Sequence, residues 1–283
     1  MSPSLTDEAF LITTPVHING PESGGTGFFF NSGESTYIVT AGHVLSEIGG
    51  HHEHMALREE IRQDPPKVTY FVRVETISDT DRRSVDLSSE GRLWGFDPNG
   101  SDIAAIQIDE KIPSITDRYL STEESENSGL EFKSCSFIED LFIGDRRLNT
   151  DRVYSLAYPG EIYDRTTRFP IRRNALIAFP HKLDFEEEPK FLTDARMDPG
   201  TSGSPIVVGP SEVRSPWGGH QSKSNPIFLL GIHSGNYLHD EGSDGSNGEH
   251  DEGSTCRNSH YSDLNETWRP EAIIRAVQAA EEI

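Results

Sequence analysis

The sequence predicts an all-β protein with two β lobes and one α-helix at its C-terminal end. Short apolar runs alternate with turn residues along most of the chain, and Gly (25) and Pro (17) are frequent among the 283 residues. This pattern is typical of β structure with long surface loops. A polar, turn-rich segment at 113–129 separates two groups of such runs. Apolar residues recur at helical spacing near the chain end.

The predicted first lobe covers residues 1–120 and contains a two-stranded hairpin. The runs GTGFFF (25–30) and TYIVTAGHV (36–44) are apolar and rich in β-forming residues, and NSGES between them predicts a turn. Further strands are predicted in KVTYFVRVETI (67–77) and SDIAAIQI (101–108). A loop or a short helix is expected between the hairpin and the third run.

The predicted second lobe covers residues 121–267. Its strands are expected in six segments, which read LEFKSCSF, RVYSLAYP, TRFPIRRNALIAF, KFLTDA, GSPIVV and PIFLLGIHSG in chain order. Residues 268–283 are predicted to form a helix, because Ile273, Ile274 and Val277 recur at helical spacing.

Composition and charge argue against several classes of function. The formal net charge is −22, so binding to nucleic-acid phosphates is not expected, whereas a basic partner or plain solubility both fit this charge. The chain has no apolar run of about eighteen residues and no secretion signal at its start, so no membrane association is expected. Its two cysteines, Cys135 and Cys256, lie far apart, which favours a reduced, cytoplasmic location.

Two segments rich in acidic residues or histidine are expected to be solvated loops. HDEGSDGSNGEHDEGS (239–254) contains nothing that could build a core, and it lacks the ligand spacing of a calcium-binding EF-hand. The cluster HHEH (51–54) has no matching distant partners that would complete a metal site. The sequence therefore predicts neither a metal site nor a cofactor.

Three residues in separate segments have the chemistry of a serine hydrolase. A serine nucleophile needs a neutral imidazole to take its proton, a carboxylate to orient that imidazole, and fixed N–H donors for the oxyanion. His43 follows a strand in TAGHV, Asp102 stands at the head of the apolar strand DIAAIQI, and Ser202 lies in PGTSGSP. Taken singly, each residue also has a structural interpretation, as a strand-end histidine, a strand cap or a turn residue.

The three motifs together resemble those of the trypsin-like serine proteases of the chymotrypsin fold. TAGHV is similar to the histidine motif of that family and SDIAAI to its aspartate motif. TDARMDPGTSGSPIV resembles the serine motif of the bacterial HtrA and glutamyl-endopeptidase branches, and the order of the motifs agrees. The resemblance implies two six-stranded antiparallel β-barrels and a triad of Ser202, His43 and Asp102. The N–H groups of Gly200 and Ser202 are expected to form the oxyanion hole.

Ser202 and Ser204 compete for the role of nucleophile. In the family pattern the nucleophile follows Gly-X and precedes Gly, which selects Ser202, whereas Pro205 biases Ser204 toward an extended backbone. We therefore expect Ser204 to pack or to bond the backbone. Thr201 stands where zymogens of the family have the aspartate of their activation switch, so activity without N-terminal processing is expected.

The segment LLGIHSGN (229–236) is expected to line the pocket for the residue before the scissile bond, the P1 residue. His233 takes the place at which glutamyl endopeptidases bind glutamate or glutamine, and an imidazole can donate to a side-chain oxygen. Ser234 resembles the serine that bonds the catalytic aspartate, and Gly235 is expected to contact substrate. Met197 stands where such enzymes have a threonine, so the pattern is incomplete and a structural role for His233 stays open.

These features predict a serine endopeptidase that acts on proteins or peptides through an acyl-enzyme. A regulated intracellular effector protease with a partner protein is consistent with the missing secretion signal. A catalytically idle protease-fold module that binds peptides or partners is the alternative, which the complete set of three residues disfavours. A quality-control protease of the HtrA type is disfavoured too, because little chain is left for a PDZ domain after Tyr237.

Overall fold

The computed structural model describes these stretches of the chain: 7–20, 24–46, 54–73, 80–112, 135–136, 147–209, 212–214, 227–237 and 263–282. The predicted linker at 113–129, the acidic segment at 239–254 and Cys256 lie outside them, as do the first three residues of the HHEH cluster. Within these stretches, no helix is long and apolar enough to cross a membrane.

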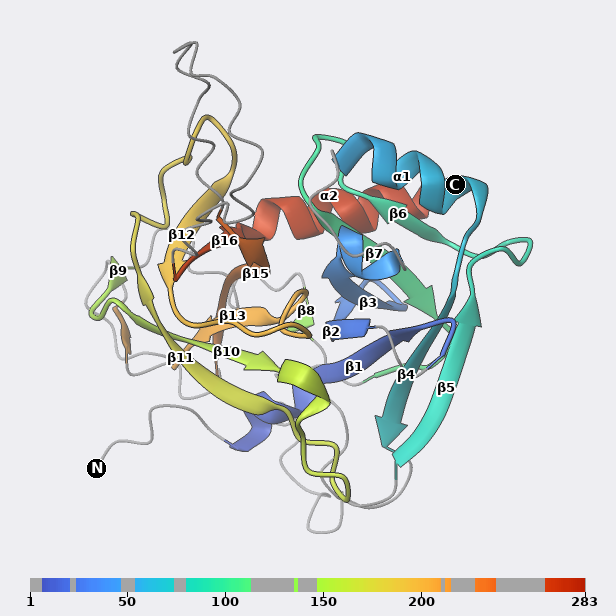
Figure 1. Cartoon of the computed structure of the whole chain (residues 1–283), viewed down its shortest axis with the longest axis horizontal. Helices are drawn as coiled ribbons and strands as arrows, with labels where there is room; N and C mark the ends of the chain where they lie inside the picture. Colours follow the sequence, from blue (N-terminus) through green and yellow to red (C-terminus); the bar gives the residue numbers. More distant parts are fainter. Residues whose placement is uncertain are drawn as a thin grey trace, which may run out of the picture.

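Two groups of β-strands and two α-helices make up the fold (Figure 1). The strands of the first lobe are β1 (Thr13–Ile18), β2 (Gly24–Ser32), β3 (Ser35–Ala41), β4 (Lys67–Arg73), β5 (Thr80–Asp86), β6 (Trp94–Phe96), β7 (Ile103–Ile108) and β8 (Cys135–Ser136). Those of the second lobe are β10 (Arg152–Ala157), β11 (Ile171–Ile177), β12 (Lys190–Asp194), β13 (Pro205–Val208), β15 (Phe228–Asn236) and β16 (Leu264–Trp268). The short strands β9 (Arg147–Leu148) and β14 (Val213–Arg214) pair with each other. The helices are α1 (His54–Gln63) and α2 (Pro270–Glu281).

The predicted all-β class and the C-terminal helix are confirmed. The second lobe is a closed barrel of six antiparallel strands, in the order β10-β11-β12-β16-β15-β13. The first lobe is a sheet in the order β5-β4-β1-β2-β3-β7-β6, and β8 pairs in parallel with β2. The prediction that LEFKSCSF supplies a strand of the second lobe is therefore wrong, because Cys135 and Ser136 pair with Phe30 and Asn31 of the first lobe. The expected hairpin is formed by β2 and β3, with Gly33 in the turn at a φ of +55°.

The first lobe differs from a closed six-stranded barrel, because β5 and β6 do not pair in the part of the chain that the structure describes. Strand β6 has only three residues and offers little backbone for a ladder. The indole N–H of Trp94 in β6 donates instead to the carbonyl of Leu87, directly after β5, at 3.1 Å. A side chain thus bridges the two ends of this sheet.

The central strands of the first lobe alternate between two hydrophobic cores. Phe29 of β2 and Ile38 of β3 point into the interior of the lobe, whereas Phe28, Phe30 and Val39 lie in a core that also includes second-lobe residues. Successive side chains of a strand point to opposite faces, so strands that are buried on both faces read as continuous apolar runs. The runs FFF and YIV are therefore signs of a sheet covered on both sides.

Helix α2 completes the core that the two lobes share. Its inward side chains are fully buried and recur at helical spacing: Ala272, Ile273, Ala276, Val277 and Ala280. Pro270 begins the helix, at a position where its missing N–H costs no hydrogen bond. The helix reaches from β16 in the second lobe to β6 in the first (Figure 1), so it packs the two lobes together.

Candidate active site

His43 and Asp102 are in direct contact, as the motifs predict. Nδ1 of His43 lies 2.6 Å from Oδ2 of Asp102, and the backbone N–H of His43 donates to Oδ1 at 2.9 Å. Because an ionised carboxylate can only accept, Nδ1 carries the proton and Nε2 is the unprotonated nitrogen of the neutral imidazole. The imidazole is thereby held in the tautomer that a general base requires.

The register of the first lobe explains this contact. Ala41 at the end of β3 pairs with Ile103 at the start of β7, so the residues just beyond these positions lie side by side. The intervening Gly42 must lack a side chain, because a Cβ there would lie 2.8 Å from Oδ1 of Asp102. The short TAGHV turn thus delivers His43 to the carboxylate.

The environment sets the proton affinity of His43. Burial works to lower the pKa of the imidazole, but the negative charge of Asp102 and the hydrogen bond to it outweigh burial. The pKa therefore lies above its ordinary value. The His43 side chain is 35% exposed and that of Asp102 only 4%, so the pair presents an accessible imidazole on a buried carboxylate.

Ser202 lies in the loop between β12 and β13, which packs closely against the end of β3. Gly203 has a φ of +86°, and a Cβ there would lie 2.0 Å from the carbonyl oxygen of Thr26 and 3.0 Å from the backbone N of Ala41. The carbonyl of Ser202 also accepts a hydrogen bond from the N–H of Thr26 at 2.8 Å. Ser202 is therefore held beside the strand that leads into His43.

The hydroxyl of Ser202 is not yet bonded to the imidazole. Ser202 is half-buried, and no hydrogen bond joins its side chain to His43, both of which the structure describes. Catalytic hydrogen bonds are often long or poorly aligned before substrate binds. The imidazole of His43 is thus oriented by Asp102, and the hydroxyl of Ser202 makes no hydrogen bond to it in this substrate-free structure.

Two N–H groups of the serine loop have no acceptor among the residues that the structure describes. These are the N–H groups of Gly200 and Ser202, whereas those of Thr201, Gly203 and Ser204 donate to backbone carbonyls at 3.2, 2.8 and 3.0 Å. Both residues are partly exposed, so their N–H groups are within reach of a bound ligand. The N–H groups of Gly200 and Ser202, with only Thr201 between them, can donate together to one oxyanion.

Thr201 and His233 hold the serine loop in this form. The hydroxyl of Thr201 donates to the carbonyl of Asp198 at 2.8 Å, and Nε2 of His233 lies 3.2 Å from the same hydroxyl. Since that hydroxyl has one proton, Nε2–H of His233 is the donor. Burial, and then the nearby imidazole of His43, lower the pKa of His233 to about 4, so this contact is uncharged at neutral pH.

The sequence profile of the trypsin-like peptidase domain matches residues 25–211. The chain belongs to the trypsin-like peptidase family. No curated protein matches the sequence. The family assignment makes this protein a trypsin-like serine endopeptidase, in agreement with the three motifs.

Two proteases are among the solved structures to which the chain is similar. The serine endoprotease from Yersinia pestis is 12% identical, with a TM-score of 0.48, and the alignment covers 100% of this chain and 68% of that one. The HtrA-type protease AlgW with a tripeptide is 12% identical, with a TM-score of 0.49 and coverages of 97% and 63%. The trypsin-like peptidase thus spans about two thirds of the length of these proteases.

Ser204 of the trypsin-like peptidase has the packing role predicted for it. Its side chain is fully buried, with 0% exposure, and its Oγ lies 2.7 Å from the Oγ of Ser155 in β10. Its carbonyl accepts the N–H of His233 at 2.9 Å. A serine enclosed in this way cannot reach a substrate, which leaves Ser202 as the accessible serine of the loop.

Ser234 has a hydrogen-bond partner that the family resemblance did not indicate. It is 2% exposed, and its Oγ accepts a hydrogen bond from the indole N–H of Trp268 at 3.1 Å. The neighbouring strand β16 places Trp268 opposite this part of β15, and its indole N–H uses one lone pair of the serine oxygen, whose O–H remains able to donate.

The remaining predicted substrate residues lie on the second lobe. Met197 packs half-buried against the interior core of the barrel. Gly235 is partly exposed in β15, and a Cβ there would meet nothing within 4 Å. Asp198, beside Met197, forms ion pairs with Arg173 and, at 3.7 Å, with Arg196. The expected pocket region therefore has open space at Gly235, and its acidic residue, Asp198, is already paired with arginine.

Thr26 is a residue of the site that sequence reasoning missed. Its hydroxyl donates to the carbonyl of Gly200 at 2.8 Å and accepts the N–H of Tyr158 at 3.0 Å. A threonine inside a strand reads as a packing residue, and nothing in the local sequence indicates that its partners lie in the other lobe. Thr26 thus ties the serine loop of the trypsin-like peptidase to its first lobe.

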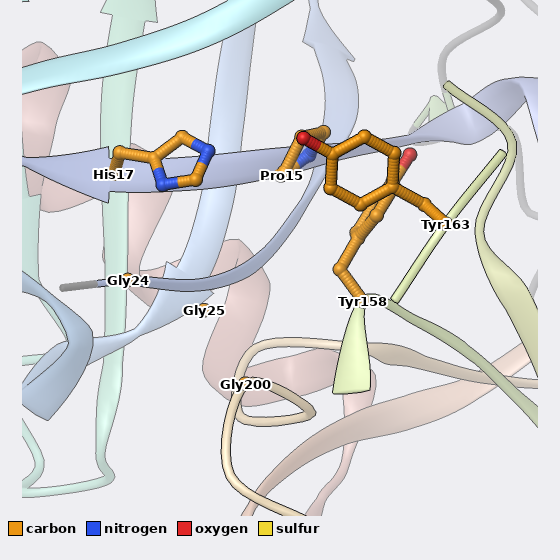
Figure 2. Close-up of a pocket in the computed structure, with 7 residues that line it drawn as sticks. All are labelled: Pro15, His17, Gly24, Gly25, Tyr158, Tyr163 and Gly200. Atoms are coloured by element: carbon orange, nitrogen blue, oxygen red, sulfur yellow. The ribbon is translucent and has the colours of Figure 1, made fainter. Parts of the chain in front are cut away.

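A small hollow lies next to Gly200, between β1, β2 and the segment after β10. Its lining residues are shown in Figure 2: Pro15, His17, Gly24, Gly25, Tyr158, Tyr163 and Gly200. The rings of Tyr158 and Tyr163 meet edge to face at 5.6 Å. Strand β15 with His233 does not contribute to this hollow, so the serine loop has an accessible space on the side of the first lobe as well.

Proposed function

We propose that this trypsin-like peptidase cleaves peptide bonds with Ser202 as the nucleophile, His43 as the general base and Asp102 as the residue that orients the base. The contact of 2.6 Å between Nδ1 of His43 and Oδ2 of Asp102, beside the Ser202 loop, carries this proposal. It supports an imidazole with its basic Nε2 turned away from the carboxylate. The N–H groups of Gly200 and Ser202 are proposed to form the oxyanion hole.

In the first half of the reaction, Oγ of Ser202 bonds to the substrate carbonyl carbon while its proton moves to Nε2 of His43. The carbonyl oxygen becomes an oxyanion, to which the two N–H groups of the serine loop donate. The C–N bond then breaks, and His43 returns the proton to the leaving amine. The result is an ester between Ser202 and the acyl part of the substrate.

In the second half, a water molecule replaces the leaving amine. His43 takes a proton from this water as the oxygen bonds to the ester carbon, and the same N–H groups bind the second oxyanion. Collapse of the intermediate releases the carboxylic acid and returns the proton to Oγ of Ser202. The hollow next to Gly200 would accommodate the part of the substrate that departs first, because residues of β1 and β2 line it and those of β15 do not.

A fluorophosphonate probe tests this function without knowledge of the substrate. Oγ of Ser202 would bond to phosphorus, fluoride would leave, and His43 would take the serine proton. We expect covalent labelling of the full, unprocessed chain and no labelling of Ser202→Ala. An unlabelled wild-type chain would instead support the idle, peptide-binding module, and labelling only after N-terminal cleavage would contradict the ordering of the loop by Thr201 and His233.

For substrate choice, we propose a preference for glutamine over glutamate at P1. His233 is neutral, with its pKa lowered to about 4, and its side chain is only 1% exposed. An amide oxygen could therefore share its Nε2–H with Thr201 only if substrate binding opens a path to the ring. A neutral imidazole offers no charge to balance a buried carboxylate. Lysine and arginine are disfavoured, because Asp198 is already paired with Arg173.

Cleavage of a proteome-derived peptide library should therefore give sites with glutamine in excess at P1. The Ser202→Ala protein serves as the background, since any cleavage that it leaves comes from contaminating proteases. A predominance of lysine or arginine at P1 would contradict the proposed pocket. A predominance of glutamate would contradict the proposed preference for glutamine.

We also propose that the protease acts inside the cell under the control of a partner protein. The uncharged contact between Thr201 and His233 supports a serine loop that needs no new N-terminus to become ordered. Control would then depend on substrate selectivity or on a bound partner. A basic partner would complement the net charge of −22.

A further inference from the structure

The turn that carries Asp102 is built around a second carboxylate, that of Asp97, which is 0% exposed. One of its oxygens accepts the hydroxyl of Ser101 at 2.5 Å, and the other accepts the N–H of Asn99 at 3.1 Å. The N–H of Asp97 donates to the carbonyl of Ile103 at 3.1 Å. The backbone on both sides of Asp102 is therefore tied to Asp97.

A guanidinium from the C-terminal helix closes this arrangement. Nε and Nη2 of Arg275 in α2 donate to the two oxygens of Asp97 at 2.8 and 2.7 Å, although 178 residues separate the pair. Burial raises the pKa of Asp97, but the hydrogen bonds from Arg275 and Ser101 outweigh burial and leave it lowered. A buried carboxylate that stays ionised depends strongly on its partner.

Arg58 of helix α1 holds the same turn from the other side. Its Nη1 donates to the carbonyl of Asp97 at 2.7 Å, and its Nη2 donates to the carbonyl of Ser101. Arg58 is 6% exposed, and its guanidinium lies over the ring of Phe96 at 5.3 Å. The charge of Asp102 also acts on this guanidinium. Two arginines, one from each helix, thus form hydrogen bonds to the turn immediately before Asp102.

The position of Arg275 is itself fixed by close packing of α2 on β6. A Cβ at Gly95 in β6 would lie 3.0 Å from the backbone N of Ala280, so the helix backbone rests almost directly on the strand. The neighbouring helix residues Ala276 and Val277 are fully buried. Arg275 is therefore presented by a rigid element rather than by a loop.

We propose that Arg275 and Arg58 are positioning residues for the reaction: through Asp97 and Ser101 they hold the turn that aims Asp102 at His43. This inference rests on the proposed function. Neither arginine touches the reacting atoms, so each acts only through the placement of the carboxylate. Displacing that carboxylate would loosen the imidazole and weaken the charge that raises its pKa.

The test is the second-order rate of fluorophosphonate labelling, measured as a function of pH for the full chain. We expect Arg275→Gln to label about 100-fold more slowly than wild type at the plateau, as for other catalytic groups displaced by about 1 Å. We also expect its acid-side midpoint to move to lower pH, because the pKa of His43 is raised by Asp102. Arg275→Lys should recover part of the rate, since it keeps the charge but not the two-pronged geometry.

Arg92→Gln is the matched control. Arg92 forms the same type of two-pronged pair with Asp109, at 2.8 and 3.0 Å, at an exposed position of the same lobe. Its labelling rate and midpoint should equal those of wild type. If Arg275→Gln fails to unfold cooperatively, the same measurements on Arg275→Lys and Arg58→Lys decide, with a slower rate and a lower midpoint expected for both.

The outcomes separate this inference from the proposed function. An unlabelled wild-type chain would contradict both the proposed function and the positioning role of the arginines. A labelled wild-type chain, with folded arginine variants that keep the wild-type rate, would overturn the positioning role alone. A slower rate with an unchanged midpoint would also overturn it, since it would indicate a general loss of structure without a change at His43.

Discussion

Replacing Ser202 with alanine is expected to lower kcat for a peptide substrate by a factor on the order of 10⁶. The substitution removes the oxygen that forms the acyl-enzyme, whereas the His43–Asp102 contact and the two N–H donors can remain in place. The small residual rate would come from binding and from the oxyanion hole. The measurement is hydrolysis of a peptide identified by cleavage profiling, with purified wild-type and variant proteins compared at equal concentration.

Ser204→Ala is the control, because it removes a hydroxyl two residues away in the same loop. Ser204 is fully buried and bonded to Ser155, so its loss should cost about 1 kcal/mol of stability. We expect this variant to keep most of its activity and to unfold at a slightly lower temperature. An inactive, folded Ser204→Ala protein together with an active Ser202→Ala protein would reverse the assignment of the nucleophile.

Asp102→Asn is expected to lower kcat at neutral pH by about 10⁴-fold. An asparagine amide can turn its N–H₂ group toward Nδ1, and the imidazole then carries its proton on Nε2, the nitrogen that must accept the serine proton. The backbone N–H of His43 can still bond the amide oxygen, so the geometry should be largely kept. Hydrolysis rates and a crystal structure of the variant would check both parts of this expectation.

The pH profile of the activity of Asp102→Asn provides a second test of His43 as the general base. In wild type the charge of Asp102 and its hydrogen bond raise the pKa of His43, and the base works only when it is deprotonated. Activity should thus fall as the pH drops through this raised pKa. Without the charge the pKa of His43 falls, so the remaining activity should persist to lower pH.

Asp109→Asn is a suitable control for this shift, because Asp109 is 77% exposed and pairs with Arg92 away from the site. Its pH profile should match that of wild type. If Asp102→Asn retained both the wild-type rate and the wild-type acid limb, His43 would not be the base that the proposal assigns.

Local sequence was sufficient to predict the core of the candidate site. His43 and Asp102 each stand at the boundary of an apolar strand, and antiparallel pairing of those strands brings the two boundaries together. Ser202 is flanked by Gly200 and Gly203, and both adopt positive φ values of +91° and +86°. In each case the residue and the feature that places it lie within a few positions of each other.

Other features depend on partners that are remote in sequence. Nothing near Asp97 indicates Arg275, because the pair forms only when α2 docks on β6. Strand β5 was missed, because Val85 is its one buried residue and the alternation is therefore weak. Strand β1 was missed as well, since Pro15 lies within it and proline argues against a strand interior.

The hydrogen bonds that Thr26 makes across the lobes have a consequence for folding during synthesis. Thr26 leaves the ribosome 174 residues before Gly200, whose carbonyl it holds, and His233 comes later still. During synthesis the segments with His43 and Asp102 emerge before the serine loop and before helix α2, which completes the core that the first lobe shares with the second. Peptidase activity is therefore expected only after the last segments have folded. An incomplete nascent chain is not expected to cleave other proteins.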